Sequence, residues 1–83
     1  MPYTVVYDPA AEDELSWIWI QATDQQAVAD ASNEIDRRLK WAPEQAGDPY
    51  GEFRRLVVHP LEVVFKVSPD DRQARVIRVA YLP

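Results

Sequence analysis

Three closely spaced strand-like segments in the second half of the sequence constrain the fold most. They cover residues 53–58, 62–67 and 72–81 and are rich in β-branched and aromatic residues. The turns between them, 59–61 and 68–71, both contain proline. Connections this short force neighbouring strands to pair antiparallel, because a parallel crossover needs about a dozen residues or more. The sequence therefore predicts an antiparallel sheet built from these strands.

The first half of the sequence predicts a further strand followed by a helix. The strand is expected at residues 3–7, where β-branched and aromatic residues dominate. Asp8 and Pro9 then match the N-cap and the first residue of a helix that runs to about Ala22. Acidic residues in its first turns fit the positive end of the helix dipole.

A second helix is predicted to follow directly and to form an antiparallel hairpin with the first. Thr23 and Gln26 match a capping box at its start, and Pro43 ends it. The segment 43–52 is expected to be a loop, because it contains both glycines and two prolines. The helix positions expected to face the core are Val28, Ala31, Ile35 and Leu39. The predicted fold class is α+β, a two-helix hairpin packed on a mostly antiparallel four-stranded sheet in the order β-α-α-β-β-β.

Length and composition narrow the class of protein further. With 83 residues, the chain is expected to be one domain spanning 1–83. It has no cysteine, which excludes disulfides and thiolate metal sites and favours a cytoplasmic location. No apolar run reaches about 18 residues, so no membrane partner is expected. No cofactor or metal motif is present either, and His59, the only histidine, is interpreted as a structural or exposed turn residue.

Charge is unevenly distributed along the chain, although the net charge is only −5. Residues 1–36 contain eight acidic residues and no lysine or arginine, whereas residues 37–83 contain all nine basic residues and six acidic ones. An anionic partner is therefore expected to meet the second part of the chain. The alternative interpretation is chance segregation on two solvated surfaces.

Alternation along the three closing strands predicts one apolar face and one cationic face. The cationic face carries Arg55, Lys66 and Arg78, one from each strand, and is the candidate anion-binding face for RNA phosphates or an acidic peptide. The alternative is that these are ordinary polar residues on a solvated sheet face. The other residues expected on the cationic face are Val57, Val64, Val76 and Ala80. The residues expected to pack against the helices are Leu56, Val58, Val63, Phe65, Val67, Ile77, Val79 and Tyr81.

The first predicted helix has more apolar residues than a single stripe can bury. Residues 15–20 are apolar at five of six positions. The stripe expected to face the sheet consists of Leu15, Ile18, Trp19 and Ala22. Trp17 and Ile20 are then left outside it and become the candidate partner-binding residues, because exposed tryptophan often anchors interfaces. The alternative is that the second helix covers them, with Trp41 closing one end of the hairpin.

This ordered set of segments resembles the RelE/ParE superfamily of type II toxins over nearly the whole chain. The segments that carry the resemblance are 7–15, 27–31 with 35–39 and Pro43, 55–58, 60–67, 71–72 and 76–79. The resemblance implies a helix hairpin on an antiparallel-rich sheet. It also implies a toxin or toxin-like component of a toxin–antitoxin system that inhibits growth and is neutralised by a cognate antitoxin. A non-toxic interaction module derived from the same fold is the alternative.

The resemblance leaves the target and the chemistry open. Family members divide between cleavage of ribosome-bound mRNA and action on DNA gyrase. Apart from the target, the sequence also leaves open whether the chain forms a homodimer. The catalytic candidates are Arg55, which matches the family's arginine on the first closing strand, Arg78, which lies near the later basic position, and Tyr81. At the place of that later basic position, this sequence has only its last four residues, 80–83, and none of them is basic. A ribosome-dependent mRNA endoribonuclease needs a base and an acid as well as cations, and only the cations are evident.

Overall fold

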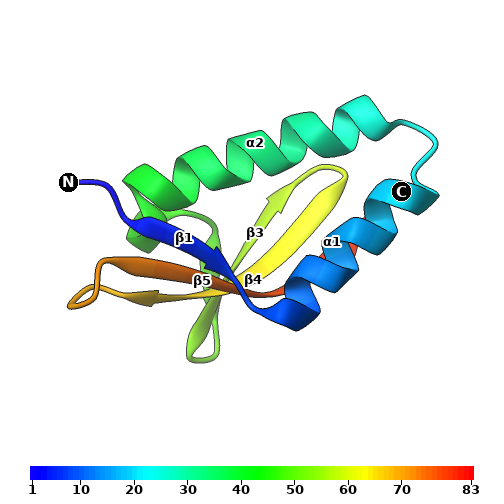
Figure 1. Cartoon of the computed structure of the whole chain (residues 1–83). Coiled ribbons are helices and arrows are strands. Elements are labelled where there is room, and N and C mark those ends of the chain that lie inside the picture. The colour runs from blue at the N-terminus through cyan, green and yellow to red at the C-terminus, as the bar shows by residue number, and fades with distance from the viewer.

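The computed structural model describes residues 1–83 and consists of helices packed against one mixed sheet (Figure 1). The elements are β1 (Thr4–Tyr7), α1 (Pro9–Gln21), α2 (Gln25–Trp41), the 3-10 helix η1 (Pro43–Gln45), β2 (Asp48–Tyr50), β3 (Phe53–Val58), β4 (Leu61–Ser68) and β5 (Gln73–Tyr81). The sheet has five strands in the order β1-β5-β4-β3-β2. The α+β class with two helices is confirmed, whereas the predicted count of four strands is wrong. Neither helix combines the length and apolarity needed to cross a membrane.

The three central strands of the sheet pair antiparallel, as predicted. The differences from the predicted sheet come from its two outer strands, β1 and β2. β3, β4 and β5 pair antiparallel through their short turns. β1 pairs parallel with β5, with Thr4 opposite Gln73. This parallel pairing is possible because residues 8–72, which contain both helices and the other three strands, form a long connection between β1 and β5. The result is a mixed sheet.

The fifth strand, β2, lies inside the segment predicted to be a loop. Tyr50 lies opposite Phe53, so only Gly51 and Glu52 connect β2 to β3. Gly51 has a φ of +63°, which a two-residue hairpin turn of type II′ requires at its first central position. Pro49 is tolerated because β2 is an edge strand. Glycine and proline thus mark a tight hairpin here rather than irregular chain.

Both helices begin close to the predicted positions. Pro9 is the first residue of α1, but the Asp8 side chain makes no cap hydrogen bond and pairs with Arg75 instead, at 3.2 Å. α2 is capped by Asp24, which accepts a hydrogen bond from the Ala27 backbone N–H at 3.0 Å, so the predicted cap at Thr23 is wrong by one residue. Figure 1 shows the two helices close together at their short connection and diverging away from it, with α2 lying across the sheet.

The core lies between the helices and one face of the sheet. α2 contributes the four residues expected from its periodicity, all of them buried, and β4 contributes Phe65, which is fully buried. β1 is held against α2 by a hydrogen bond from the Tyr7 hydroxyl to Asp36 at 2.7 Å, and burial raises the pKa of Tyr7. The buried hydrophobic residues are Ala11, Ile18, Val28, Ala31, Ile35, Leu39, Ala46, Leu56, Leu61, Val63, Phe65, Ala74, Val76 and Val79.

A β-bulge in β5 overturns two of the predicted side-chain placements. Val64 lies opposite Arg78, but the next residue of β4, Phe65, lies opposite Val76, so Ile77 is the extra residue. Val76 is fully buried, although it was expected on the cationic face, and Ile77 lines a hollow on that face, although it was expected in the core. Because one residue is inserted at the bulge, the β5 residues before it point to the opposite face from the one that unbroken alternation predicts.

Candidate functional site

The open face of the sheet, opposite the core, brings together two of the three predicted cationic residues. Arg55 lies opposite Val64, and Val64 lies opposite Arg78, so the two arginines flank one valine in a single cross-strand row. Two strand spacings put their Cα atoms roughly 10 Å apart. Their side chains are 47% and 70% exposed, so both are accessible to a ligand.

Each of these arginines has a carboxylate partner that alternation could not reveal. An Arg55 terminal nitrogen lies 2.9 Å from Glu62 Oε2, and Arg78 Nε lies 3.1 Å from Glu14 Oε2. The other Glu14 oxygen accepts the Val79 backbone N–H at 3.0 Å, which ties α1 to the edge of β5 that β1 leaves unpaired. Exposed pairs of this kind contribute only about 0–1 kcal/mol, so an anion can compete for the guanidinium groups.

The third predicted cation, Lys66, lies apart from this row and next to another basic residue. Lys66 is directly opposite Arg75 in the β4–β5 pairing. Unbroken alternation would have placed Arg75 with the core residues, and the bulge instead turns it to the open face. The one signal for this in the sequence is an arginine at a position that the pattern assigns to the core. The open face therefore carries four cations, of which Arg55, Arg75 and Arg78 are ion-paired.

A hollow of about 290 Å³ lies beside Arg78 on the open face. It is lined by Tyr50, Phe53, Glu62, Val64, Ile77, Arg78, Val79 and Ala80. The combination of two aromatic rings, a carboxylate and a guanidinium provides surfaces for stacking, hydrogen bonding and anion binding. Sequence reasoning missed Tyr50, because it was assigned to a loop, and missed Glu62, because its pairing with Arg55 depends on strand register.

The remaining catalytic candidate is not brought to this hollow. Tyr81 is opposite Leu61, which is buried, and its side chain packs against the core. It therefore lies on the face of the sheet away from Arg55 and Arg78. His59 is exposed in the β3–β4 turn. No three histidine or carboxylate side chains converge to hold a metal ion.

The candidate partner-binding residues of α1 lie on the surface. Trp17 is 63% exposed and Ile20 is 67% exposed, whereas Ile18 between them is buried. Trp19 was expected to face the sheet but is 43% exposed. It lines a groove of about 340 Å³ between the two helices, together with Leu15, Ser16, Ala29, Ser32 and Asn33. Trp17 and Ile20, three positions apart on one side of α1, form an exposed apolar patch of the kind that marks an interaction surface.

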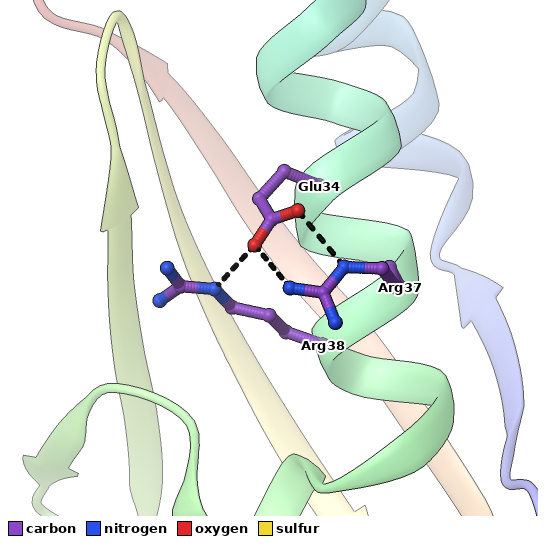
Figure 2. Close-up of polar contacts among 3 residues, drawn as sticks. All are labelled: Glu34, Arg37 and Arg38. Atoms are coloured by element: carbon purple, nitrogen blue, oxygen red, sulfur yellow. Dashed lines mark hydrogen bonds and ion pairs between the residues drawn. The ribbon is translucent and has the colours of Figure 1, made fainter.

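Trp41 and the arginines before it form a separate feature at the end of α2. Trp41 is exposed there and does not close the helix hairpin. Figure 2 shows Glu34 accepting hydrogen bonds from both Arg37 and Arg38. The hydrogen bonds from Arg37 and then Arg38 lower the pKa of the Glu34 carboxyl to about 2. This carboxylate therefore stays ionised at a lower pH than an ordinary glutamate does.

Sequence comparisons identify no family for this chain, whereas structural comparisons identify its fold. No protein-family model matches it, and no curated protein matches it significantly. A chain of the toxin–antitoxin complex RelBE2 from Mycobacterium tuberculosis superposes with a TM-score of 0.81 at 15% identity, over 98% of this chain and 92% of that one. A chain of the chromosomal ParDE system from P. aeruginosa gives a TM-score of 0.72 at 17% identity, over 98% of this chain and 97% of that one.

The free form of such a toxin is also similar. The isolated E. coli RelE toxin gives a TM-score of 0.69 at 14% identity, over 98% of this chain and 85% of that one. These similarities cover 98% of this chain and 85–97% of the other chains, which means that they concern the whole arrangement of helices and strands rather than a shared motif. The chain has the fold of the RelE/ParE-type toxins.

Proposed function

We propose that this protein is the toxin component of a type II toxin–antitoxin system and is neutralised by a cognate antitoxin. The observation that supports this most strongly is the match of the entire fold, over 98% of the chain, to chains from the RelBE2 and ParDE systems. The cellular target is either ribosome-bound mRNA or DNA gyrase. The pairing of Arg55 and Arg78 with carboxylates favours a second candidate, a non-toxic interaction module of the same fold.

Two surfaces are proposed to serve this function. The open face with Arg55, Lys66 and Arg78 is the anion-binding surface, because these cations project into solvent from a rigid sheet. The Trp17 and Ile20 region is the apolar anchor for the antitoxin, because an extended segment that folds on binding needs buried apolar contacts to offset its loss of entropy. The two surfaces serve different steps, so they can be separated by mutation.

Induced expression in a bacterial host is expected to arrest growth, and co-expression of a small protein encoded next to this gene is expected to restore it. The Trp17→Ala/Ile20→Ala variant should still arrest growth but should be rescued poorly, because its antitoxin anchor is lost. Growth curves with both inducers measure these effects. Cleaved transcripts after induction identify an mRNA target, and a DNA-damage response identifies gyrase.

The control for this experiment is the Trp41→Ala variant, which removes an exposed tryptophan far from the α1 patch and should be rescued normally. Absence of arrest by the folded wild-type protein would reject the toxin proposal in favour of the interaction module. Equal rescue of the wild type and the Trp17→Ala/Ile20→Ala variant would show that the anchor lies elsewhere.

The Arg55→Ala/Arg78→Ala variant is expected to bind anions more weakly while folding almost normally. Each exposed ion pair contributes about 0–1 kcal/mol, and Glu14 keeps its bond to the Val79 N–H when Arg78 is lost. Binding to an acidic peptide at low salt and thermal unfolding should be measured in parallel. A Gln21→Glu/Thr23→Asp variant, altered at exposed positions near the α1–α2 turn, makes the same change in net charge. Unchanged affinity, or the same loss in both variants, would reject a specific anion-binding face.

A further inference from the structure

The C-terminal end of α2 forms a pocket that the proposed function does not use. This α2-end pocket has a volume of about 260 Å³ and is lined by Arg37, Arg38, Trp41, Ala42, Gln45, Ala46 and Gly47. It lies on the helix side of the sheet, between the end of α2 and the segment that leads into β2. It is therefore distinct from the hollow on the open face, with which it shares no lining residue.

The two arginines in this pocket are oriented by Glu34 but still have free donors. Glu34 accepts from Nε and one terminal nitrogen of Arg37, at 3.0 and 2.6 Å, and from Nε of Arg38 at 2.9 Å. Both terminal nitrogens of Arg38 and one of Arg37 make no hydrogen bond. Figure 2 shows the terminal nitrogens of Arg38 directed away from Glu34. Guanidinium groups oriented in this way can bind phosphate oxygens with little further loss of side-chain entropy.

Trp41 provides an aromatic surface beside these donors. Its side chain is 59% exposed although it belongs to the last turn of a well-anchored helix. The end of α2 is held by the Ala42 N–H to Arg38 carbonyl bond at 2.9 Å and the Tyr3 N–H to Lys40 carbonyl bond at 2.7 Å. The Lys40 Nζ lies 5.4 Å from the centre of the Trp41 ring. An exposed indole next to cations is the combination on which an unpaired nucleic-acid base stacks.

The last turn and a half of α2, which lines the pocket, is basic although the chain as a whole is acidic. Arg37, Arg38 and Lys40 follow Glu34 and Asp36 in this part of α2, which leaves an excess of one positive charge, and Glu44 lies beside Trp41 in an adjoining hollow. Within α2 the three acidic residues, Asp30, Glu34 and Asp36, all precede these cations. The helix therefore changes from acidic to basic along its length, so a polyanion that contacts α2 is expected at its C-terminal end.

Arg38 also connects the α2-end pocket with the open face. It lines a second hollow, of about 280 Å³, whose other lining residues are Gly47, Asp48, Arg55, Leu56 and Val57. This hollow lies beside Leu56 and Val57, the β3 residues next to the part of β3 that pairs with β2, and Arg55 also lines it. The basic side chains thus follow a path from Trp41 around the sheet edge to the open face, with Asp48 as the one acidic residue in the second hollow.

We propose that the α2-end pocket binds single-stranded nucleic acid, with one base stacked on Trp41 and an adjacent phosphate held by Arg37 and Arg38. An unpaired strand fits better than a duplex, because stacking on an indole requires a base that is free of its neighbours. It also fits better than an acidic peptide, whose carboxylates would use the arginines but leave Trp41 exposed. The proposal is independent of toxicity, since it concerns binding at a surface outside the open-face hollow.

The test is the affinity of the full chain for a short fluorescently labelled oligouridylate, measured by anisotropy at low salt. Trp41→Ala and Arg37→Gln/Arg38→Gln are each expected to weaken binding about tenfold or more, whereas Trp41→Phe should retain most of it. Trp17→Ala, which removes an equally exposed tryptophan from α1, should bind like the wild type. In a Trp17→Phe/Trp19→Phe background, Trp41 is the single remaining tryptophan, and its fluorescence should be quenched by the oligonucleotide.

Several results would overturn the proposal. One is no binding by the folded wild type at low salt. Another is binding that Arg55→Ala/Arg78→Ala abolishes but Trp41→Ala leaves unchanged, which would confine the strand to the open face. A polyglutamate peptide that binds as tightly as the oligonucleotide and does not depend on Trp41 would identify an acidic-peptide site instead. None of these outcomes depends on growth arrest, so failure here is distinguishable from failure of the toxin proposal.

Discussion

Replacing Phe65 with alanine is expected to lower the free energy of unfolding by about 3–5 kcal/mol. Phe65 is fully buried at the centre of β4, opposite Arg54 of β3 and Val76 of β5. Its removal would leave a cavity where the sheet meets the helices, and close-packed neighbours can collapse into such a cavity only in part. Domains have about 5–15 kcal/mol of stability in total, so this one substitution should remove a large share of it.

Urea unfolding followed by circular dichroism measures this effect. Val57→Ala on β3 is the matched control, because Val57 is 45% exposed on the open face and its truncation should change stability by no more than about 0.5 kcal/mol. A loss below about 1 kcal/mol for Phe65→Ala would mean that β4 does not present this side to the core, and the register of the central strands would then be wrong.

Gly47→Ala is expected to destabilise the protein much more than Gly51→Ala. Both glycines have a positive φ, +65° and +63°, which costs an alanine about 1–3 kcal/mol. A Cβ on Gly47 would in addition lie 2.0 Å from the carbonyl oxygen of Arg55, whereas a Cβ on Gly51 would meet nothing within 4 Å. Relieving that backbone overlap requires the segment before β2 to move away from β3, at a further cost of about 1–3 kcal/mol.

The two glycine variants should be compared by thermal and urea unfolding, so that Gly51→Ala accounts for the conformational cost that both share. The surplus loss in Gly47→Ala then reports the close approach of this segment to β3. Arg54 strengthens that approach by donating hydrogen bonds to the carbonyls of Ala46 and Gly47, at 2.9 and 3.0 Å. Equal losses in the two variants would contradict the described packing.

The ion pairs of the open face define what a ligand must do there. Arg55 and Arg78 are accessible, but each already contacts a carboxylate, from Glu62 and Glu14 respectively. A phosphate or a partner carboxylate must displace or bridge these pairs, so binding at this face should be sensitive to salt. Glu62 also places a carboxylate in the same hollow as Arg78, next to Arg55, a pairing that strand alternation alone did not reveal.

Features that depend on residues close together in the chain were predictable from the sequence alone. Turn residues and strand alternation were enough to place β3, β4 and β5 in antiparallel order and to put Arg55, Lys66 and Arg78 opposite the core. Helical periodicity predicted the buried face of α2 and the exposure of Trp17 and Ile20 on α1. In each case the physical cause, a turn geometry or a side-chain period, acts over only a few residues.

Features that depend on distant segments were decided only by the tertiary structure. The parallel pairing of β1 with β5, the bulge at Ile77 and the pairing of Arg78 with Glu14, 64 positions away, all require the fold to be in place. A single inserted residue reverses which face every preceding side chain of a strand occupies, and composition carries no record of it. Local chemistry therefore determined both helices, the three closing strands and the buried face of α2, whereas long-range packing decided the pairing of β2, strand register, charge partners and the shape of each candidate site.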